Sequence, residues 1–297
     1  MDLVVTLVAP GTLDPGLVAP LVKHLGAEHA ERLSGSATDV FVSGDLAAVR
    51  QATKDATCDL GIDALVQPAA TRHKRLLLSD MDSTLIGQEC IDELAERRGI
   101  KSDVAAITAQ AMRGEIDFTA SLTERVALLK GIPVEEIAHL LETTITLSPG
   151  AAQMVKGLKR HGVRTVLVSG GFTHFAEPIG RKLGIDSAHA NTLLVADGLL
   201  TGELAAPILG VDAKRERLER ECEALGISPF EAIALGDGAN DLAMIAAAGL
   251  GVAYRAKPAV AAAADAEIRH SDLTTILYAM GLSGAAIDDT PASNSED

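Results

Sequence analysis

The sequence predicts an α/β protein with a doubly wound, mostly parallel sheet, a helical insertion and a small N-terminal α+β domain. Short continuous apolar runs mark the strands of the larger sheet, because parallel strands covered on both faces show such runs. The runs lie at residues 75–80, 163–171, 231–238 and 250–254. The first three end in Gly, Ser or Asp and precede helical stretches. Strands that alternate with helices favour a doubly wound sheet, whose ligands bind beyond the carboxyl ends of the strands.

The first 68 residues show a different pattern, strand and helix in the order βαββαβ, with one strand poorly marked. This order suits a small ferredoxin-like layer of helices on a sheet. Apolar alternation and helical spacing place strands at 2–10, 38–44 and 61–68 and helices at 17–26 and 45–55. Small and polar residues from Pro68 to Lys74 indicate a joint. We therefore predict one domain over residues 1–72 and a second over residues 73–285.

An all-helical insertion separates the first two strands of the larger sheet, at about residues 88–147. Glycines and capping residues bound four helices there. The predicted helices span residues 89–99, ending at Gly99; 102–114, opening with Ser102 as cap; 117–131, opening with Asp117; and 133–142, with Pro133 in the first turn. Helices at this end of a sheet form a plausible lid.

Two further segments complete the chain. Residues 191–204 carry two apolar runs around Asp197-Gly198 and predict a hairpin. The polar, acidic residues 286–297 predict a disordered tail.

Composition argues against several classes of partner. Lys and Arg number 26 and Asp and Glu 41, which gives a net charge of −15. Such a charge repels nucleic acid and anionic lipid. The longest stretch without Asp, Glu, Lys or Arg runs from Leu273 to Ile287, short of the ~18–20 apolar residues of a membrane span. No basic segment opens the chain, and three distant cysteines fit a reducing compartment. We expect a cytoplasmic protein without nucleic-acid or membrane partners.

Two carboxylates, Asp80 and Asp82, come where the first strand of the larger sheet ends. Residues i and i+2 that leave a strand point the same way, so both can face one site. A pair of carboxylates suits a metal, or a nucleophile with an acid/base partner. The alternative is a turn in which Asp and Ser cap the next helix.

Three other groups of residues follow the later strands or lead into them. Ser169, Gly170 and Gly171 follow the second strand, where backbone N–H groups can approach an anion; the alternative is an ordinary turn. Asp237 and Asp241, with Asn240 between them, suit a hard cation such as Mg²⁺; the alternative is a capped helix. Lys214 opens the helix over 212–226 and could point at phosphate or be solvated.

In combination these motifs carry a resemblance. DMDST at 80–84, VSGG at 168–171, Lys214 and GDGAND at 236–241 resemble the motifs of the haloacid dehalogenase (HAD) superfamily of phosphatases. Residues 80–95, 108–131, 168–172 and 236–244 are similar to the phosphoserine phosphatases of that superfamily, within a resemblance over most of residues 75–280. Met81 stands where the family often has an aromatic residue and should affect packing alone. The resemblance implies a HAD-like Rossmannoid core, and the N-terminal domain loosely resembles ACT-like regulatory domains.

The resemblance implies Mg²⁺-dependent hydrolysis of O-phospho-L-serine to L-serine and phosphate, the last step of serine biosynthesis. Asp80 would form an aspartyl-phosphate, and Asp82 would protonate the leaving group and later activate water. The metal would be held by Asp80, Asp237 and the backbone carbonyl of Asp82, with support from Asp241. An acid at neutral pH requires a raised pKa, which nearby acidic groups can supply.

The family's substrate-binding positions also match residues of this sequence. The resemblance assigns phosphate to Lys214, Ser169 and Gly170, the ammonium group to Glu89 and the carboxylate to Arg125, a residue type that grips carboxylates with two bonds. The remaining matches are the apolar walls Met112 and Phe118 and the substrate contact Asn240. Without the resemblance, Glu89 and Arg125 would be taken as solvated, and Met112 and Phe118 as core.

Several outcomes stay open at the level of sequence. A phosphotransferase would pass the phosphoryl group from Asp80 to another hydroxyl, and a phosphatase of the same fold could act on other small phosphomonoesters. An amino-acid sensor would use the N-terminal domain and keep the second domain as a scaffold. Feedback by L-serine and a homodimer are compatible with the sequence.

Overall fold

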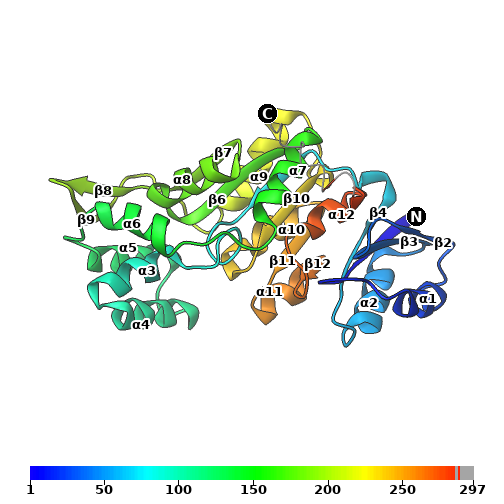
Figure 1. Ribbon diagram of the computed structural model, residues 1–297. Helices are drawn as coiled ribbons and strands as arrows, with labels where there is room; N and C mark the ends of the chain where they lie inside the picture. The colour runs from blue at the N-terminus through cyan, green and yellow to red at the C-terminus, as the bar shows by residue number, and fades with distance from the viewer. Residues whose placement is uncertain (285–286, 288–297) are drawn as a thin grey trace, which may run out of the picture.

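The computed structural model describes residues 1–284 and 287, with all side chains in that range except that of Met112. The predicted tail over residues 286–297 lies outside the described residues apart from Ile287. Two sheets organise the chain, with the small N-terminal sheet and the helical insertion at opposite ends of the larger sheet (Figure 1). No helix in the described part of the chain is both long and apolar enough to pass through a membrane.

The N-terminal sheet is antiparallel with strand order β2-β3-β1-β4, which confirms the predicted βαββαβ arrangement. Asp14 and Asp45 cap its two helices by accepting hydrogen bonds from the backbone N–H groups of Gly16 and Ala48. The elements are β1 (Asp2–Val8), α1 (Pro15–His24), β2 (His29–Arg32), β3 (Ala37–Ser43), α2 (Leu46–Thr57) and β4 (Asp63–Pro68). The poorly marked strand is β2, whose four residues are all exposed and therefore show no apolar alternation.

The larger sheet has six strands in the order β12-β11-β10-β5-β6-β7, and every neighbouring pair is parallel. The doubly wound sheet is thus confirmed. Its strands are β5 (Leu76–Ser79), β6 (Arg164–Phe172), β7 (Ser187–Asn191), β10 (Ala232–Gly236), β11 (Leu250–Tyr254) and β12 (Ala266–Ile268). Its helices are α7 (Ala151–Arg160), α8 (Thr173–Leu183), α9 (Ala213–Leu225), α10 (Leu242–Ala247), α11 (Pro258–Ala263) and α12 (Thr275–Ala279), with short 3-10 turns at Ala69–Thr71, Pro229–Glu231 and Ala239–Asp241.

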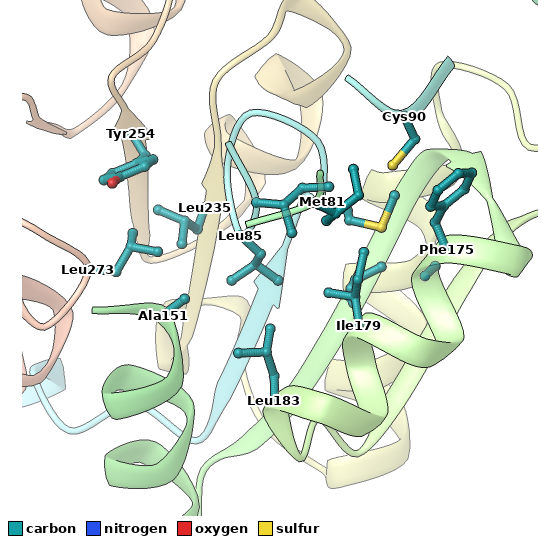
Figure 2. Packing of buried hydrophobic residues seen from close by; sticks show 14 of the residues in the cluster. Met81, Leu85, Cys90, Ala151, Phe175, Ile179, Leu183, Leu235, Tyr254 and Leu273 are labelled. Atoms are coloured by element: carbon teal, nitrogen blue, oxygen red, sulfur yellow. The ribbon is translucent and has the colours of Figure 1, made fainter. Parts of the chain in front are cut away.

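Both faces of this sheet are covered by apolar packing. Leu77 of β5 joins a cluster with residues of α7, α8 and α12, while Leu76 and Leu78 join a second cluster with residues of α9, α10 and α11. Alternate residues of a strand face opposite sides, so a strand covered on both sides must be apolar throughout. In Figure 2 the side chain of Met81 points toward Phe175 and Ile179 of α8. Met81 is fully buried, so this residue of the first motif packs in the core, as predicted.

The helical insertion consists of α3 (Cys90–Arg98), α4 (Lys101–Met112), α5 (Phe118–Leu128) and α6 (Glu135–Thr143); we call these helices the cap. Asp117 caps α5 as predicted, accepting from the backbone N–H of Ala120 at 2.8 Å. The prediction that Ser102 caps α4 is wrong. Ser102 lies inside α4, because the left-handed turn at Gly99 ends α3 and α4 begins at once after Ile100.

The first-turn position predicted for Pro133 is also wrong. Pro133 precedes α6, whose N-cap is Val134, and forms an antiparallel bridge with Leu199. The bridge ties the cap to the predicted hairpin, β8 (Leu193–Ala196) and β9 (Leu199–Leu204). The hairpin turn at Asp197-Gly198 has positive φ at both residues, 50° and 77°, as a two-residue turn of this kind requires.

Buried polar contacts hold the N-terminal sheet against the larger one. The Asp63 carboxylate, at the start of β4, accepts hydrogen bonds from the backbone N–H groups of Arg269, His270 and Ser271. Arg72 pairs with Asp39 at 2.8 Å, and both carboxylates are almost completely buried. The segment after β12 is therefore positioned by a side chain from the N-terminal sheet.

Candidate active site

A cavity of about 630 Å³ lies between the carboxyl ends of β5, β6 and β10 and the cap helices α3 and α5. This is the place where doubly wound sheets bind ligands. Most of the predicted site residues line it: Asp80, Asp82, Glu89, Phe118, Arg125, Ser169, Gly170, Asp237 and Asn240. We call it the catalytic cavity. Lys214 and Asp241 are buried and are not among its lining residues, and the side chain of Met112 lies outside the described residues.

Asp80 and Asp82 both line the catalytic cavity, as their i, i+2 spacing predicts. The backbone N–H of Asp80 extends the strand pairing by donating to the Leu235 carbonyl of β10, and its Oδ1 accepts from the N–H of Met81 at 2.7 Å. Asp82 Oδ1 accepts from the N–H of Cys90, the first residue of α3, at 3.2 Å. Asp80 is thus held in place at the end of β5, and the Asp82 carboxylate is held by the first helix of the cap.

The segment Ser169-Gly170-Gly171 does not follow its strand, as the sequence suggested, but lies within the end of β6. The pairing of β6 with β7 is irregular between Val168 and Phe172, so these residues bulge instead of ending the strand. Ser169 Oγ accepts from the Gly171 N–H at 2.8 Å. A Cβ at Gly171 would lie 2.8 Å from Asp82 Oδ2, so only glycine lets β6 approach this carboxylate.

Lys214 reaches from α9 under the catalytic cavity. Its Nζ lies 2.7 Å from Asp80 Oδ1 and 2.5 Å from Asp241 Oδ1. The other Asp241 oxygen accepts from the N–H groups of Asp237 and Gly238 at 3.0 and 2.9 Å. The solvated alternative for Lys214 is therefore wrong. Asp241 fixes both the loop after β10 and the lysine that faces Asp80.

The electrostatics of the site are dominated by buried carboxyl groups. Burial raises the pKa of Asp80, and the neighbouring Asp241 raises it further while Lys214 opposes both. Burial and the charge of Glu89 raise the pKa of Asp82 to about 7. Burial and Asp241 raise the pKa of Asp237 to about 6. Burial would lower the pKa of Lys214, but the charges of Asp80 and Asp241 raise it above its ordinary value.

Carboxyl oxygens of Asp80, Asp237 and Asp241 lie within 4.8 Å of one another. Thr84 Oγ1 donates to Asp237 Oδ1 at 3.0 Å, which leaves the second Asp237 oxygen for another partner. One lysine cannot balance three clustered carboxylates together with Asp82. Oxygen donors with excess negative charge suit a hard divalent cation, so the donor set fits a divalent metal.

The cap contributes the residues predicted to choose the substrate. Glu89 is the N-cap of α3 and its Oε1 accepts from Ser83 Oγ at 2.7 Å. Arg125 of α5 donates from Nε to the Ser121 carbonyl at 3.3 Å, and the residue lines the catalytic cavity. Phe118 comes so close to β6 that a Cβ at Gly170 would lie 3.2 Å from its ring. An acidic and a basic group thus share one cavity with an apolar wall.

Sequence reasoning missed several residues that line this cavity or hold its carboxylates. Thr84 belongs to the first motif, so its hydroxyl could have been considered as a partner for a carboxylate. Ser121 and Asp92 line the cavity from α5 and α3, and helical spacing from Arg125 and Glu89 was a usable signal. Lys257 also lines it, and its backbone N–H donates to the Asp237 carbonyl at 3.3 Å. No local signal marks Lys257, because its position depends on the order of strands in the sheet.

Comparison with known proteins agrees with this geometry. Residues 77–246 match the family of haloacid dehalogenase-like hydrolases. A phosphoserine phosphatase of Polaromonas sp. is 49% identical over 208 residues, which are 68% of this chain and 88% of that protein. A crystal structure of a HAD family hydrolase from Salmonella enterica serovar Typhi has a TM-score of 0.86 and 28% identity, covering 94% of this chain and 98% of its own. A phosphoserine phosphatase structure described as a phospho-aspartyl intermediate analogue has a TM-score of 0.64 and 43% identity, covering 69% of this chain and 98% of its own.

Proposed function

The chain belongs to the haloacid dehalogenase-like hydrolases, and from that premise we propose that it is a phosphoserine phosphatase. It hydrolyses O-phospho-L-serine to L-serine and phosphate. The observation that carries the proposal is the pairing of two carboxyl groups in one cavity. Asp80 is held by Lys214, and Asp82 has a pKa raised to about 7. Relatives 40–49% identical to the chain bear the name phosphoserine phosphatase.

Asp80 is the nucleophile in this proposal. A carboxylate oxygen of Asp80 attacks phosphorus, a bond forms between them, and the bond from phosphorus to the serine oxygen breaks. The ion pair with Lys214 supports this role, because the lysine charge favours the ionised form of Asp80 and opposes the rise in its pKa that burial and Asp241 cause. Lys214 also lies beside Ser169 and Gly170, so that its charge is available to the phosphoryl oxygens.

Asp82 is the acid and then the base. Its pKa of about 7 keeps a large fraction protonated at neutral pH, which an acid for an alkoxide leaving group requires. Asp82 gives this proton to the serine oxygen. It then removes a proton from the water that attacks the phosphorus of the aspartyl-phosphate, and the acyl oxygen bond to phosphorus breaks. The Asp80 carboxylate is restored with release of phosphate.

Asp80, Asp237 and the backbone carbonyl of Asp82 would hold Mg²⁺, with Asp241 in support. When bound, the metal supplies positive charge that reduces the repulsion between the carboxylate and the phosphate dianion. The clustering of Asp80, Asp237 and Asp241 oxygens supports this assignment.

Substrate recognition divides between the sheet and the cap. We assign the phosphate to Ser169, the Gly170 N–H and Lys214, with Asn240 as a further substrate contact. In the cap, Glu89 binds the ammonium group and Arg125 the carboxylate. Phe118 and Met112 are the proposed apolar walls.

The proposal also covers the pathway step, the location of the protein and its division into domains. We place the reaction at the last step of L-serine biosynthesis in the cytoplasm and divide the chain into domains 1–72 and 73–285. Feedback by L-serine through the first domain and assembly into a homodimer stay predictions.

A substrate panel combined with chemical trapping tests the proposal. Phosphoserine should turn over faster than sugar phosphates, and rapid quench should place phosphorus on the Asp80 carboxyl. The Asp80→Asn variant should lose both turnover and label. Faster turnover of sugar phosphates would contradict the roles of Glu89 and Arg125, and label on any other residue would contradict the mechanism. Transfer to an added alcohol in preference to water would identify a phosphotransferase.

A further inference from the structure

Ser121 of α5 carries a buried hydroxyl group that makes no contact within the fold. The residue lines the catalytic cavity and is 1% exposed. Among residues 1–284 and 287, its Oγ has no hydrogen-bond partner. A buried polar atom without a partner costs free energy, and most buried polar atoms in folded proteins are paired. An unpaired hydroxyl at the wall of a cavity therefore indicates a partner that a ligand of the cavity supplies.

The helix itself offers a serine or threonine hydroxyl a local partner, the carbonyl four residues earlier. Three threonines of the cap helices donate to that carbonyl at 2.8–3.0 Å: Thr108, Thr123 and Thr143. Ser121 Oγ does not; the equivalent carbonyl, that of Asp117, accepts from the backbone N–H of Ser121 at 2.9 Å. The Ser121 hydroxyl thus keeps its capacity to donate and to accept, in the same helix in which the Thr123 hydroxyl is satisfied locally.

Arg125 lies one helical turn after Ser121 and is folded back toward it. In an α-helix a long side chain covers the turn on the N-terminal side of its own Cα, and Arg125 Nε donates to the Ser121 carbonyl at 3.3 Å. Within the part of the chain that the structure describes, this is the one hydrogen bond of the Arg125 side chain, and no carboxylate lies within 4.0 Å of its nitrogens. The N–H groups of both Nη atoms are therefore unused, beside the turn that carries the Ser121 hydroxyl.

One face of α5 forms this wall of the catalytic cavity. Phe118, Ser121, Leu122 and Arg125 all line the cavity and recur at the spacing of a single helical face. A carboxylate accepts two parallel bonds from a guanidinium and retains lone pairs for a further donor. A ligand carboxylate held by Arg125 therefore lies next to a hydroxyl that can donate to it.

We propose that Ser121 is a specificity-determining residue, whose Oγ–H donates a hydrogen bond to the substrate carboxylate that Arg125 binds. The inference rests on the proposed phosphoserine phosphatase activity and adds a second donor to the part of the site that binds the carboxylate. The hydroxyl strengthens substrate binding without stabilising the free protein, because it becomes paired only in the complex.

Kinetics of the Ser121→Ala variant on two substrates test the assignment. KM for phosphoserine should rise about tenfold with little change in kcat, since the lost bond joins a charged group that is bound in the ground state and in the transition state alike. KM for phosphoethanolamine, which has no carboxylate, should stay nearly constant. Thr123→Val is the matched control, because it removes an exposed hydroxyl of the same helix that is bonded to Thr119; it should leave both KM values unchanged. An unchanged KM for phosphoserine in Ser121→Ala, or an equal rise for both substrates, overturns the assignment.

Thermal unfolding of the free protein separates this role from a structural one. Ser121→Ala should melt at the temperature of the unchanged protein or above it, because the fold loses no hydrogen bond and alanine favours the helix. A lower melting temperature would show that the hydroxyl is bonded within the fold, which overturns the assignment.

Calorimetric titration with phosphoserine in the presence of Mg²⁺ measures binding apart from turnover. In the Asp80→Asn protein, adding Ser121→Ala should weaken binding about tenfold, and adding Thr123→Val should not. Equal binding by the two double variants, with normal hydrolysis by the unchanged protein, would overturn the Ser121 assignment alone. If the unchanged protein binds phosphoserine without hydrolysing it, weaker binding on Ser121→Ala would keep the assignment and refute the proposed function alone.

Discussion

Lys214 and Asp241 form a buried ion pair, with 2.5 Å between Nζ and Oδ1, beneath the carboxylate proposed as nucleophile. Each partner has a second task. Lys214 also contacts Asp80, and Asp241 holds the N–H groups at the start of the loop after β10. The position of the nucleophile and the shape of the metal-binding loop therefore depend on the same contact.

Replacing Lys214 by Met should destabilise the fold as well as abolish turnover. The substitution leaves Asp80 and Asp241 buried without their cation, and breaking a buried pair in this way costs about 3–5 kcal/mol. Urea denaturation at neutral pH measures the loss. Arg215→Met is the control, since Arg215 is the exposed next residue of α9 and pairs with Glu219 on the surface; it should change the unfolding free energy by less than about 1 kcal/mol. Equal stability of the two variants would contradict the role of the pair.

Replacing Asp82 by Asn should slow cleavage most for substrates whose leaving group must receive a proton. Phosphoserine releases an alkoxide, and loss of the acid should lower kcat about 10²–10⁴-fold. Para-nitrophenyl phosphate releases a stable phenolate, so cleavage of its phosphate ester should be much less affected. Rapid-quench rates of aspartyl-phosphate formation on the two substrates provide the comparison. Equal losses of that first step would assign Asp82 a different role.

Replacing Arg125 by Gln should raise KM for phosphoserine about tenfold or more, because a charged hydrogen bond to the substrate carboxylate is lost. Phosphoethanolamine lacks that carboxylate, so its KM should stay nearly constant. Arg113→Gln is the control, being an exposed cap arginine paired with Glu115, and should affect neither substrate. A parallel rise for both substrates would show that Arg125 does not recognise the carboxylate.

Chelation with EDTA should abolish phosphoserine turnover, and added Mg²⁺ should restore it. The Asp237→Asn variant should need a higher Mg²⁺ concentration, because one oxygen donor of the acidic cluster loses its charge. Activity measured against Mg²⁺ concentration gives the shift. Full activity in the presence of EDTA would exclude the assigned metal.

Lys74, which does not line the catalytic cavity, should make the free energy of unfolding depend on pH. Its Nζ donates to the Phe230 carbonyl at 2.9 Å, and burial lowers its pKa to about 8, below the value near 10.4 of an unfolded chain. Between these two values the unfolded state binds more protons, so stability rises with pH, by about 3 kcal/mol in all. Urea denaturation across this range should show the rise in the unchanged protein and its absence in Lys74→Met. Parallel curves would contradict the shift.

Much of the fold could be predicted because the parallel strands are apolar throughout and end at characteristic residues. Strand β2 was hard to place because its four residues are exposed and paired on one side alone. The errors at Ser102 and Pro133 have a common cause. Both residues are good local starting signals, but the turn after Gly99 and the bridge to Leu199 set where the helices begin.

Residues of the candidate site could be predicted where they follow the end of a strand within a few positions, as Asp80, Asp82 and Asp237 do. Contacts between distant segments could not. That Asp241 binds Lys214 while capping its own loop depends on how α9 packs against β5, β6 and α10. The placement of Lys257 depends on β11 lying next to β10, which periodicity does not reveal.

The carboxylate of Asp63 has a consequence for how the molecule can be divided. Three successive backbone N–H groups of the segment after β12 donate to a side chain from β4, so excising the first 72 residues would remove the acceptor that holds this segment in place. The two sheets should consequently melt in a single calorimetric transition, and a shortened catalytic fragment should be less heat-resistant than the intact polypeptide.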